Sequence, residues 1–182
     1  MFLSLIFAVI FSVLAYLFEA FAKTFSVIVA ILRSIPVLAV LLMVLTAVNR
    51  SFAPVLVCFL ALFPILYTAF LTALKGVSNQ LKEMCYLYKV PIKKQVKYLY
   101  IPKILPKILL DGAGAISFGI KLTVSAEILA NVYGSVGGFM QEASLYLLTP
   151  ELFALTFIVC LIGILVEFVG KILSEKAEKK LL

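Results

Sequence analysis

Histidine and tryptophan are absent from this 182-residue chain, and it contains only nine acidic residues. Without histidine, and with Cys58, Cys85 and Cys160 far apart, the sequence indicates neither a zinc nor a haem site. We therefore expect no metal ion and no other cofactor, and we interpret the cysteines as free, apolar side chains. Paired carboxylates and a serine-based catalytic arrangement are also missing, which makes an enzyme the weakest functional class and leaves no catalytic residues to propose.

Charge is scarce as well. Charged residues make up 14% of the chain and hydrophobic residues 64%, and the mean hydropathy is +1.19. A soluble domain of this length needs a polar exterior that such a composition cannot supply. The net charge of +7 comes from lysine and arginine beside apolar segments, where they fix topology and face anionic lipid headgroups. We therefore predict an all-α integral membrane protein and no nucleic-acid partner.

The apolar runs approach the roughly 20 residues that cross a bilayer as a helix. They predict five transmembrane helices, at about residues 3–22, 32–48, 53–73, 105–132 and 151–172. Four prolines lie in or near these helices, and neighbouring helices can satisfy the backbone groups that proline frees: Pro36, Pro54, Pro64 and Pro106. The whole chain, residues 1–182, is interpreted as one membrane domain.

A cleaved signal peptide is the alternative interpretation of residues 1–22, because Ala20-Phe21-Ala22 fits a small-x-small cleavage pattern. No lysine or arginine precedes the apolar run, however, and Glu19 lies just before the site. A retained helix is favoured.

The distribution of positive charge predicts the orientation. Lys23 and Arg33 flank the first connection, only Arg50 lies in the second, and residues 133–150 contain no lysine or arginine. Most other cations lie between the third and fourth spans or beyond the fifth, or close to those ends of the spans: Lys75, Lys82, Lys89, Lys93, Lys94, Lys97, Lys103, Lys107, Lys171, Lys176, Lys179 and Lys180. Because positive residues favour the cytoplasmic side, we expect residues 76–103 and the C-terminus inside and the N-terminus outside.

Residues 76–103 form the one polar, basic island between two long apolar segments. Ser78 or Asn79 can cap a short helix that carries Glu83 and ends near Tyr88. Pro91 disfavours a helical conformation for the residue before it, and a second basic helix is expected from Ile92 to about Tyr100. A merely solvated basic loop is the alternative.

The island carries a family resemblance. Glu83-Met84-Cys85, a turn at position 89 and the pair Ile101-Pro102 resemble the EAA motif of permease subunits in binding-protein-dependent ABC importers. Four further segments resemble the nitrate/sulfonate/taurine branch, so the likeness extends over nearly the whole chain from about residue 23: Arg33-Ser34-Ile35-Pro36, Phe63-Pro64-Ile65, Ala126-Glu127-Ile128-Leu129 and Gly134 to Gly138.

The chain departs from the family pattern in three ways. Met84-Cys85 replaces Ala-Ala, and Lys89 stands where the motif has glycine. If the turn requires a positive φ, lysine costs about 1 kcal/mol or more there. The chain also begins at what would be the second span of a usual family member, so the first span is expected to be lacking.

The resemblance implies a permease that forms the pathway for a small solute, anionic or containing nitrogen or sulfur, in a bacterial inner membrane. Its partners would be ABC ATPase subunits, a second permease chain (most simply an identical one), an extracytoplasmic substrate-binding protein and lipid. ATP hydrolysis belongs to the partner, since Gly170-Lys171 lacks the rest of a P-loop. Seven residues are expected to couple to the ATPase, Glu83 by polar contact and the others by packing, by the turn or by the connection to the next span: Glu83, Met84, Cys85, Leu87, Tyr88, Lys89 and Pro102.

Ionisable residues inside spans usually face the bundle interior or a water-filled cavity. Lys121, Ser125 and Glu127 are therefore candidate pathway residues. Lys121 could attract an anionic cargo, but neutralisation of a carboxylate, such as that of Glu167, is favoured. An interhelical hydrogen bond is favoured for Glu127, and Asp111 is expected to bind basic neighbours.

Two other interpretations remain open. An ATP-independent channel or carrier would normally show coupling residues in several spans, whereas these spans hold few ionisable groups. A non-transporting membrane scaffold would support no ATPase-dependent flux. Small residues such as Ala115 and Gly119 indicate close helix packing, and the segment after Gly134 offers a surface to a binding protein.

Overall fold

The computed structural model describes residues 2–181, and every regular element in them is helical. In chain order these are α1 (Phe2–Leu17), α2 (Glu19–Ser34), α3 (Val37–Ala47), α4 (Ala53–Lys75), α5 (Asn79–Leu87), α6 (Ile92–Gln95), the π-helical segment η1 (Val96–Tyr100), α7 (Ile101–Ala130), α8 (Val136–Leu145) and α9 (Thr149–Leu181). The prediction of an all-helical membrane protein is confirmed.

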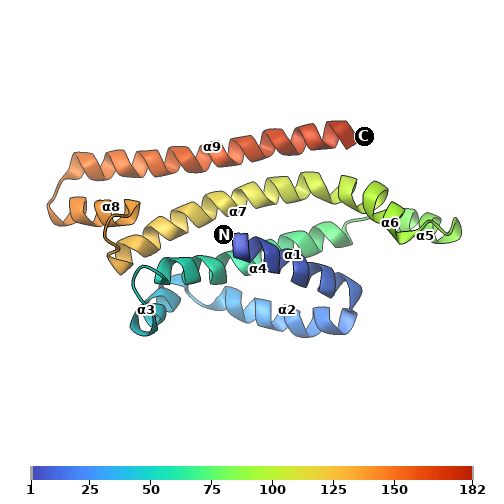
Figure 1. The fold of residues 1–182 in the computed structure, drawn as a ribbon, viewed down its shortest axis with the longest axis horizontal. Helices are drawn as coiled ribbons and strands as arrows, with labels where there is room; N and C mark the ends of the chain where they lie inside the picture. The colour runs from blue at the N-terminus through green and yellow to red at the C-terminus, as the bar shows by residue number, and fades with distance from the viewer. Residues whose placement is uncertain (1, 182) are drawn as a thin grey trace.

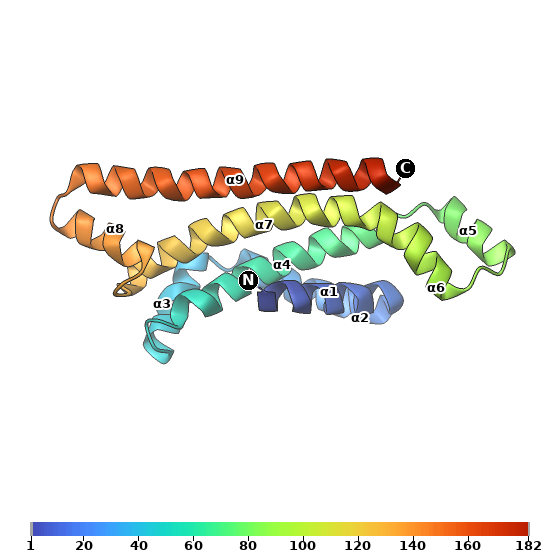
Figure 2. The same cartoon turned by 45° about the horizontal axis from the view of Figure 1, so that its top comes forward.

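Three long helices, α4, α7 and α9, run side by side along the molecule (Figures 1 and 2). The hairpin of α1 and α2 packs against α4 on the side away from α9, so the elements form a layered bundle. The short helices α5 and α6 lie at one end, together with the C-terminus (Figure 1). Helices α3 and α8 lie at the opposite end, so the molecule has two poles.

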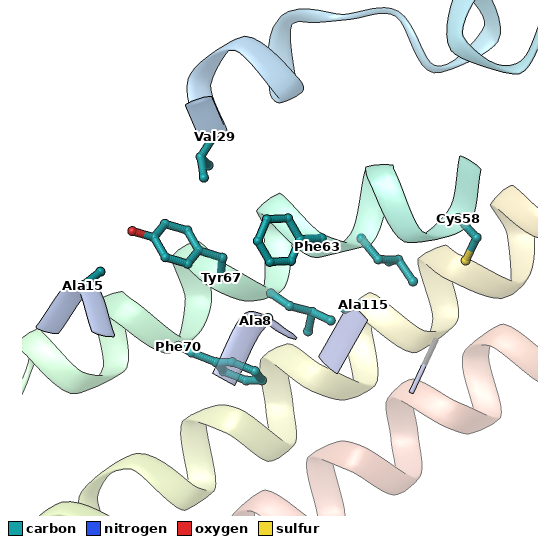
Figure 3. Packing of buried hydrophobic residues seen from close by; sticks show 10 residues of the cluster. Ala8, Ala15, Val29, Cys58, Phe63, Tyr67, Phe70 and Ala115 are labelled. Carbon is teal, nitrogen blue, oxygen red and sulfur yellow. The ribbon is translucent and has the colours of Figure 1, made fainter. Parts of the chain in front are cut away.

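Aromatic side chains hold α1, α2 and α4 together. Phe11 of α1 stacks on Phe25 of α2 with ring centroids 4.9 Å apart, and Phe25 meets Tyr67 of α4 edge to face at 5.1 Å. Small residues let the helices approach: Ala8 of α1 and Ala115 of α7 are buried in the same cluster (Figure 3). The prediction that small residues along the fourth span serve packing therefore agrees with the structure.

The predicted count of five spans is not reached. In the described part of the chain, three helices are long and apolar enough to cross a membrane: Ala53–Lys75, Ile92–Ala130 and Thr149–Lys179. A fourth is reached only if α2 and α3 count as one broken span, and α1 is shorter than a usual span. The predicted spans 53–73, 105–132 and 151–172 each lie within one of these long helices.

The two N-terminal spans were predicted with the wrong boundaries. The span at 3–22 is interrupted at Phe18, whose extended backbone separates α1 from α2. The span at 32–48 is bent by 88° between α2 and α3. Pro36 explains the bend, because a proline disfavours the helical conformation for the residue before it, and Ile35 is extended. Pro64 and Pro106, in contrast, lie inside continuous helices.

Candidate functional site

The polar island predicted at residues 76–103 protrudes from one pole of the molecule as α5, a turn, and the start of a very long helix (Figure 2). Predicted boundaries and observed helices agree closely here, since α5 covers Asn79–Leu87. The proposed cap is not formed: Ser78 is the residue before α5, and its side chain makes no capping hydrogen bond. The helix start is held by the backbone instead, with the Lys82 amide donating to the Ser78 carbonyl at 3.3 Å.

Lys89 adopts a left-handed conformation, with φ at 49°. Two hydrogen bonds close the end of α5 around it: the Val90 amide donates to the Cys85 carbonyl at 2.9 Å, and the Lys89 amide donates to the Tyr86 carbonyl at 3.1 Å. This is a Schellman motif, in which the residue after the C-cap is usually glycine. The position therefore has the backbone that the motif's glycine would favour, and lysine is strained there.

Most of the residues predicted to contact an ATPase lie on the surface. Glu83 is exposed, and the side chains of Met84, Leu87 and Tyr88 keep 52%, 75% and 77% of their area accessible. Cys85 is only partly buried. Exposed apolar side chains on a short polar helix are energetically unfavourable in water, so their clustering marks a surface suited to a protein partner.

The second basic helix continues directly into the membrane span. One helix runs without interruption from Ile92 to Ala130 over 39 residues, about 58 Å at the usual rise per residue. Pro102 lies within it and cannot donate a backbone hydrogen bond, and the preceding turn widens into η1. The second basic helix and the fourth span were predicted as separate helices joined by a connection, whereas the structure joins them into one helix.

Tyrosines connect this region to α1. The hydroxyls of Tyr16 and Tyr100 are hydrogen-bonded at 3.0 Å, and the ammonium of Lys82 lies 5.4 Å from the centroid of the Tyr16 ring. The contact joins α5, η1 and the last turn of α1. It was not predicted, since residues this far apart in sequence show no local pattern.

The three candidate pathway residues of α7 have local partners. Lys121 lies 3.8 Å from Glu167 of α9, as favoured from the sequence. Ser125 donates to the Lys121 carbonyl of its own helix at 3.0 Å. The carboxylate of Glu127 accepts a hydrogen bond from the Gly137 amide at 3.0 Å and so joins α7 to the start of α8. Their roles in transport stay predictions.

Arg33 is placed differently from the prediction. It was expected to flank a connection at the membrane edge, but its guanidinium donates to the Pro64 carbonyl and to the Thr68 hydroxyl, near the middle of α4. Sequence reasoning missed this because the bend after α2 was not predicted. Asp111, expected to bind basic neighbours, lines a cavity with Arg33 and Lys107, although neither cation lies within ion-pair distance of it.

The arrangement can be compared with known proteins. The family model of the binding-protein-dependent transport system inner membrane component matches residues 2–180. The chain belongs to this family. Membership makes it the permease of an ABC importer in an inner membrane and implies an ATPase subunit and a substrate-binding protein as partners.

A solved structure supports the fold of this permease. A chain in the inward-facing structure of the MetNI methionine ABC transporter superposes with a TM-score of 0.75 over 97% of this chain and 90% of that chain. Sequence identity is 19%, so the likeness concerns the fold alone. No curated protein matches the chain significantly.

Proposed function

We propose that residues 76–103 are the cytoplasmic coupling loop of the permease and that α5 docks into a cleft of the ATPase subunit. The observation that carries this is the exposed surface of α5, where Glu83 offers a charge and Met84, Leu87 and Tyr88 offer apolar area. A groove on a partner would bury that area and gain about 25 cal/mol for each Å². Cys85 is partly buried and is proposed to add packing contact with the ATPase.

The long helix supplies the mechanical connection in this proposal. Displacement of α5 by the ATPase passes through the hydrogen-bonded Lys89 turn into a helix that reaches from Ile92 to Ala130. At its far end Glu127 holds the first turn of α8. Closure of the ATPase at one pole is thereby transmitted across the membrane to α8, the surface proposed for the binding protein.

The positive-inside distribution of charge supports an orientation with α5 and the C-terminus in the cytoplasm. Helix α1 runs toward the same pole, because Tyr16 in its last turn contacts Tyr100 and Lys82. This direction fits an N-terminus on the outer side.

Assembly and cargo complete the proposal. One coupling helix per chain implies two permease chains around the pathway, most simply a homodimer embedded in lipid. The short motifs at Arg33–Pro36 and Ala126–Leu129 support the nitrate/sulfonate/taurine branch and a small anionic or sulfur- or nitrogen-containing cargo.

Affinity purification of the tagged chain from its native membrane in mild detergent tests the docking. We expect a P-loop ATPase to co-purify with the wild type and to fall at least about tenfold with Glu83→Arg, since one reversed charge at a desolvated contact costs more than 1.4 kcal/mol. Glu175→Arg is the matched control, because Glu175 is an exposed carboxylate near the C-terminal end of α9. Recovery of the ATPase unaffected by Glu83→Arg would contradict the coupling role.

A further inference from the structure

A cavity of about 660 Å³ lies between α2, α4 and α7. Its lining includes five side chains that carry charge or a hydroxyl: Arg33, Thr68, Thr72, Lys107 and Asp111. The opposite face of α7 is lined differently, since Gly112, Ala113 and Ile116 border an apolar cavity against α9. Helix α7 therefore presents a polar side and an apolar side.

The guanidinium of Arg33 lies beside the middle of α4, one of the helices long and apolar enough to cross a membrane. It donates to the Pro64 carbonyl at 3.4 Å and to the Thr68 hydroxyl, and Pro64 is the midpoint of α4. A charge at this depth is costly unless it faces the bundle interior or a water-filled cavity. Arg33 is exposed and lines the cavity between α2, α4 and α7. An arginine at the cavity beside the middle of a membrane-spanning helix therefore points to a functional role for the polar side.

Both hydrogen bonds of Arg33 use the same guanidinium nitrogen, Nη2. Among the residues that the structure describes, no carboxylate lies within 4.0 Å of this side chain. Lys107 and Asp111 line the same cavity, so two cations oppose one carboxylate and the net charge is positive. Arginine retains a fork of donors suited to the two oxygens of a carboxylate or sulfonate.

We propose that Arg33 binds the anionic group of the cargo as it passes through the cavity between α2, α4 and α7. The inference deepens the proposed transport function and rests on it. Its ligand is an oxyanion of the carboxylate or sulfonate class, held by the free donors of the guanidinium. Thr68 positions the guanidinium through its hydroxyl, which donates in turn to the carbonyls of its own helix.

Cysteine labelling in membranes tests whether water reaches this cavity and whether its electrostatic potential is positive. In a chain freed of its native cysteines, Thr72→Cys lines the cavity and is exposed. We expect anionic methanethiosulfonate ethylsulfonate to label it faster than the cationic trimethylammonium reagent. Arg33→Gln should lower the ratio of the two rates about tenfold, because a charged cleft concentrates counter-ions, whereas Arg33→Lys should keep it near the wild-type value.

The control for labelling is a chain with native Cys160 as its single cysteine, exposed on the apolar helix α9. We expect it to react with neither charged reagent, because that helix faces lipid. An unreactive Thr72→Cys, or a rate ratio that Arg33→Gln leaves unchanged, would overturn the proposal.

Protection experiments then test binding. Methanesulfonate should slow the labelling of Thr72→Cys in the wild-type background and lose this effect in Arg33→Gln. Dimethyl sulfone, nearly the same size but neutral, should not protect. Equal protection by both compounds, or protection by neither, would overturn the anion site. These measurements require neither ATPase nor binding protein, so their outcome is independent of the co-purification that tests the coupling loop.

Discussion

At the scale of single residues, Lys89 follows from a local backbone rule, whereas the need for Gly137 depends on a contact with another helix. The glycine position of the motif required a left-handed backbone, and Lys89 adopts it with φ at 49°. The role of Gly137 has no such local signature. A Cβ there would lie 2.6 Å from the Val124 carbonyl oxygen, so the close approach of α8 to α7 depends on glycine.

Replacement of Lys89 by glycine should stabilise the end of α5. Glycine removes the left-handed strain of about 1 kcal/mol. Amide hydrogen exchange over residues 79–91 should therefore slow several-fold. Lys93→Gly is the matched control: it removes the same charge from an exposed position of α6, where glycine should accelerate exchange. Faster exchange in Lys89→Gly would show that lysine makes a stabilising contact at the turn.

At the scale of elements, the ion pair between Lys121 and Glu167 joins the two long helices α7 and α9. Gly163 adds to this contact, because a Cβ there would lie 2.9 Å from Cε of Lys121. The backbone of α9 therefore lies close to α7 at Gly163, and the charge of Glu167 is neutralised by Lys121. The sequence indicated the pairing of Lys121, since an isolated intramembrane cation requires a partner.

A double-mutant cycle tests this pair. Lys121→Glu and Glu167→Lys should each lower the melting temperature of the detergent-solubilised chain, because each leaves two like charges facing each other. The combined exchange should recover most of the loss, with a coupling energy of about 1 kcal/mol, in the range of polar pairs between membrane helices. Additive losses in the double variant would mean that the two side chains do not interact.

At the scale of the whole molecule, the two poles should lie on opposite sides of the membrane. A membrane-impermeant maleimide applied to intact spheroplasts should label Tyr133→Cys, which replaces a side chain 98% exposed in the connection to α8. Native Cys85, as the single cysteine, should react only after permeabilisation. Labelling of both positions from the same side would contradict the orientation derived from positive charge.

The sequence by itself determined the class of protein, because a composition of 64% hydrophobic residues leaves no soluble exterior. It also determined the short helix of the island, the strained position 89 and the neutralised Lys121, since these follow from local backbone chemistry or from the cost of a charge in lipid. The three long helices could be predicted for the same reason. Their apolar runs are about as long as a helix that crosses a bilayer.

The tertiary structure alone decided where Arg33 lies. Whether Pro36 bends the chain depends on what packs around it, since Pro64 and Pro106 remain in continuous helices. The 88° bend after α2 leaves the guanidinium of Arg33 against the middle of α4. Likewise, the contact between Tyr16 and Tyr100 joins residues 84 positions apart. Such placements arise from packing between distant segments, which no local pattern records.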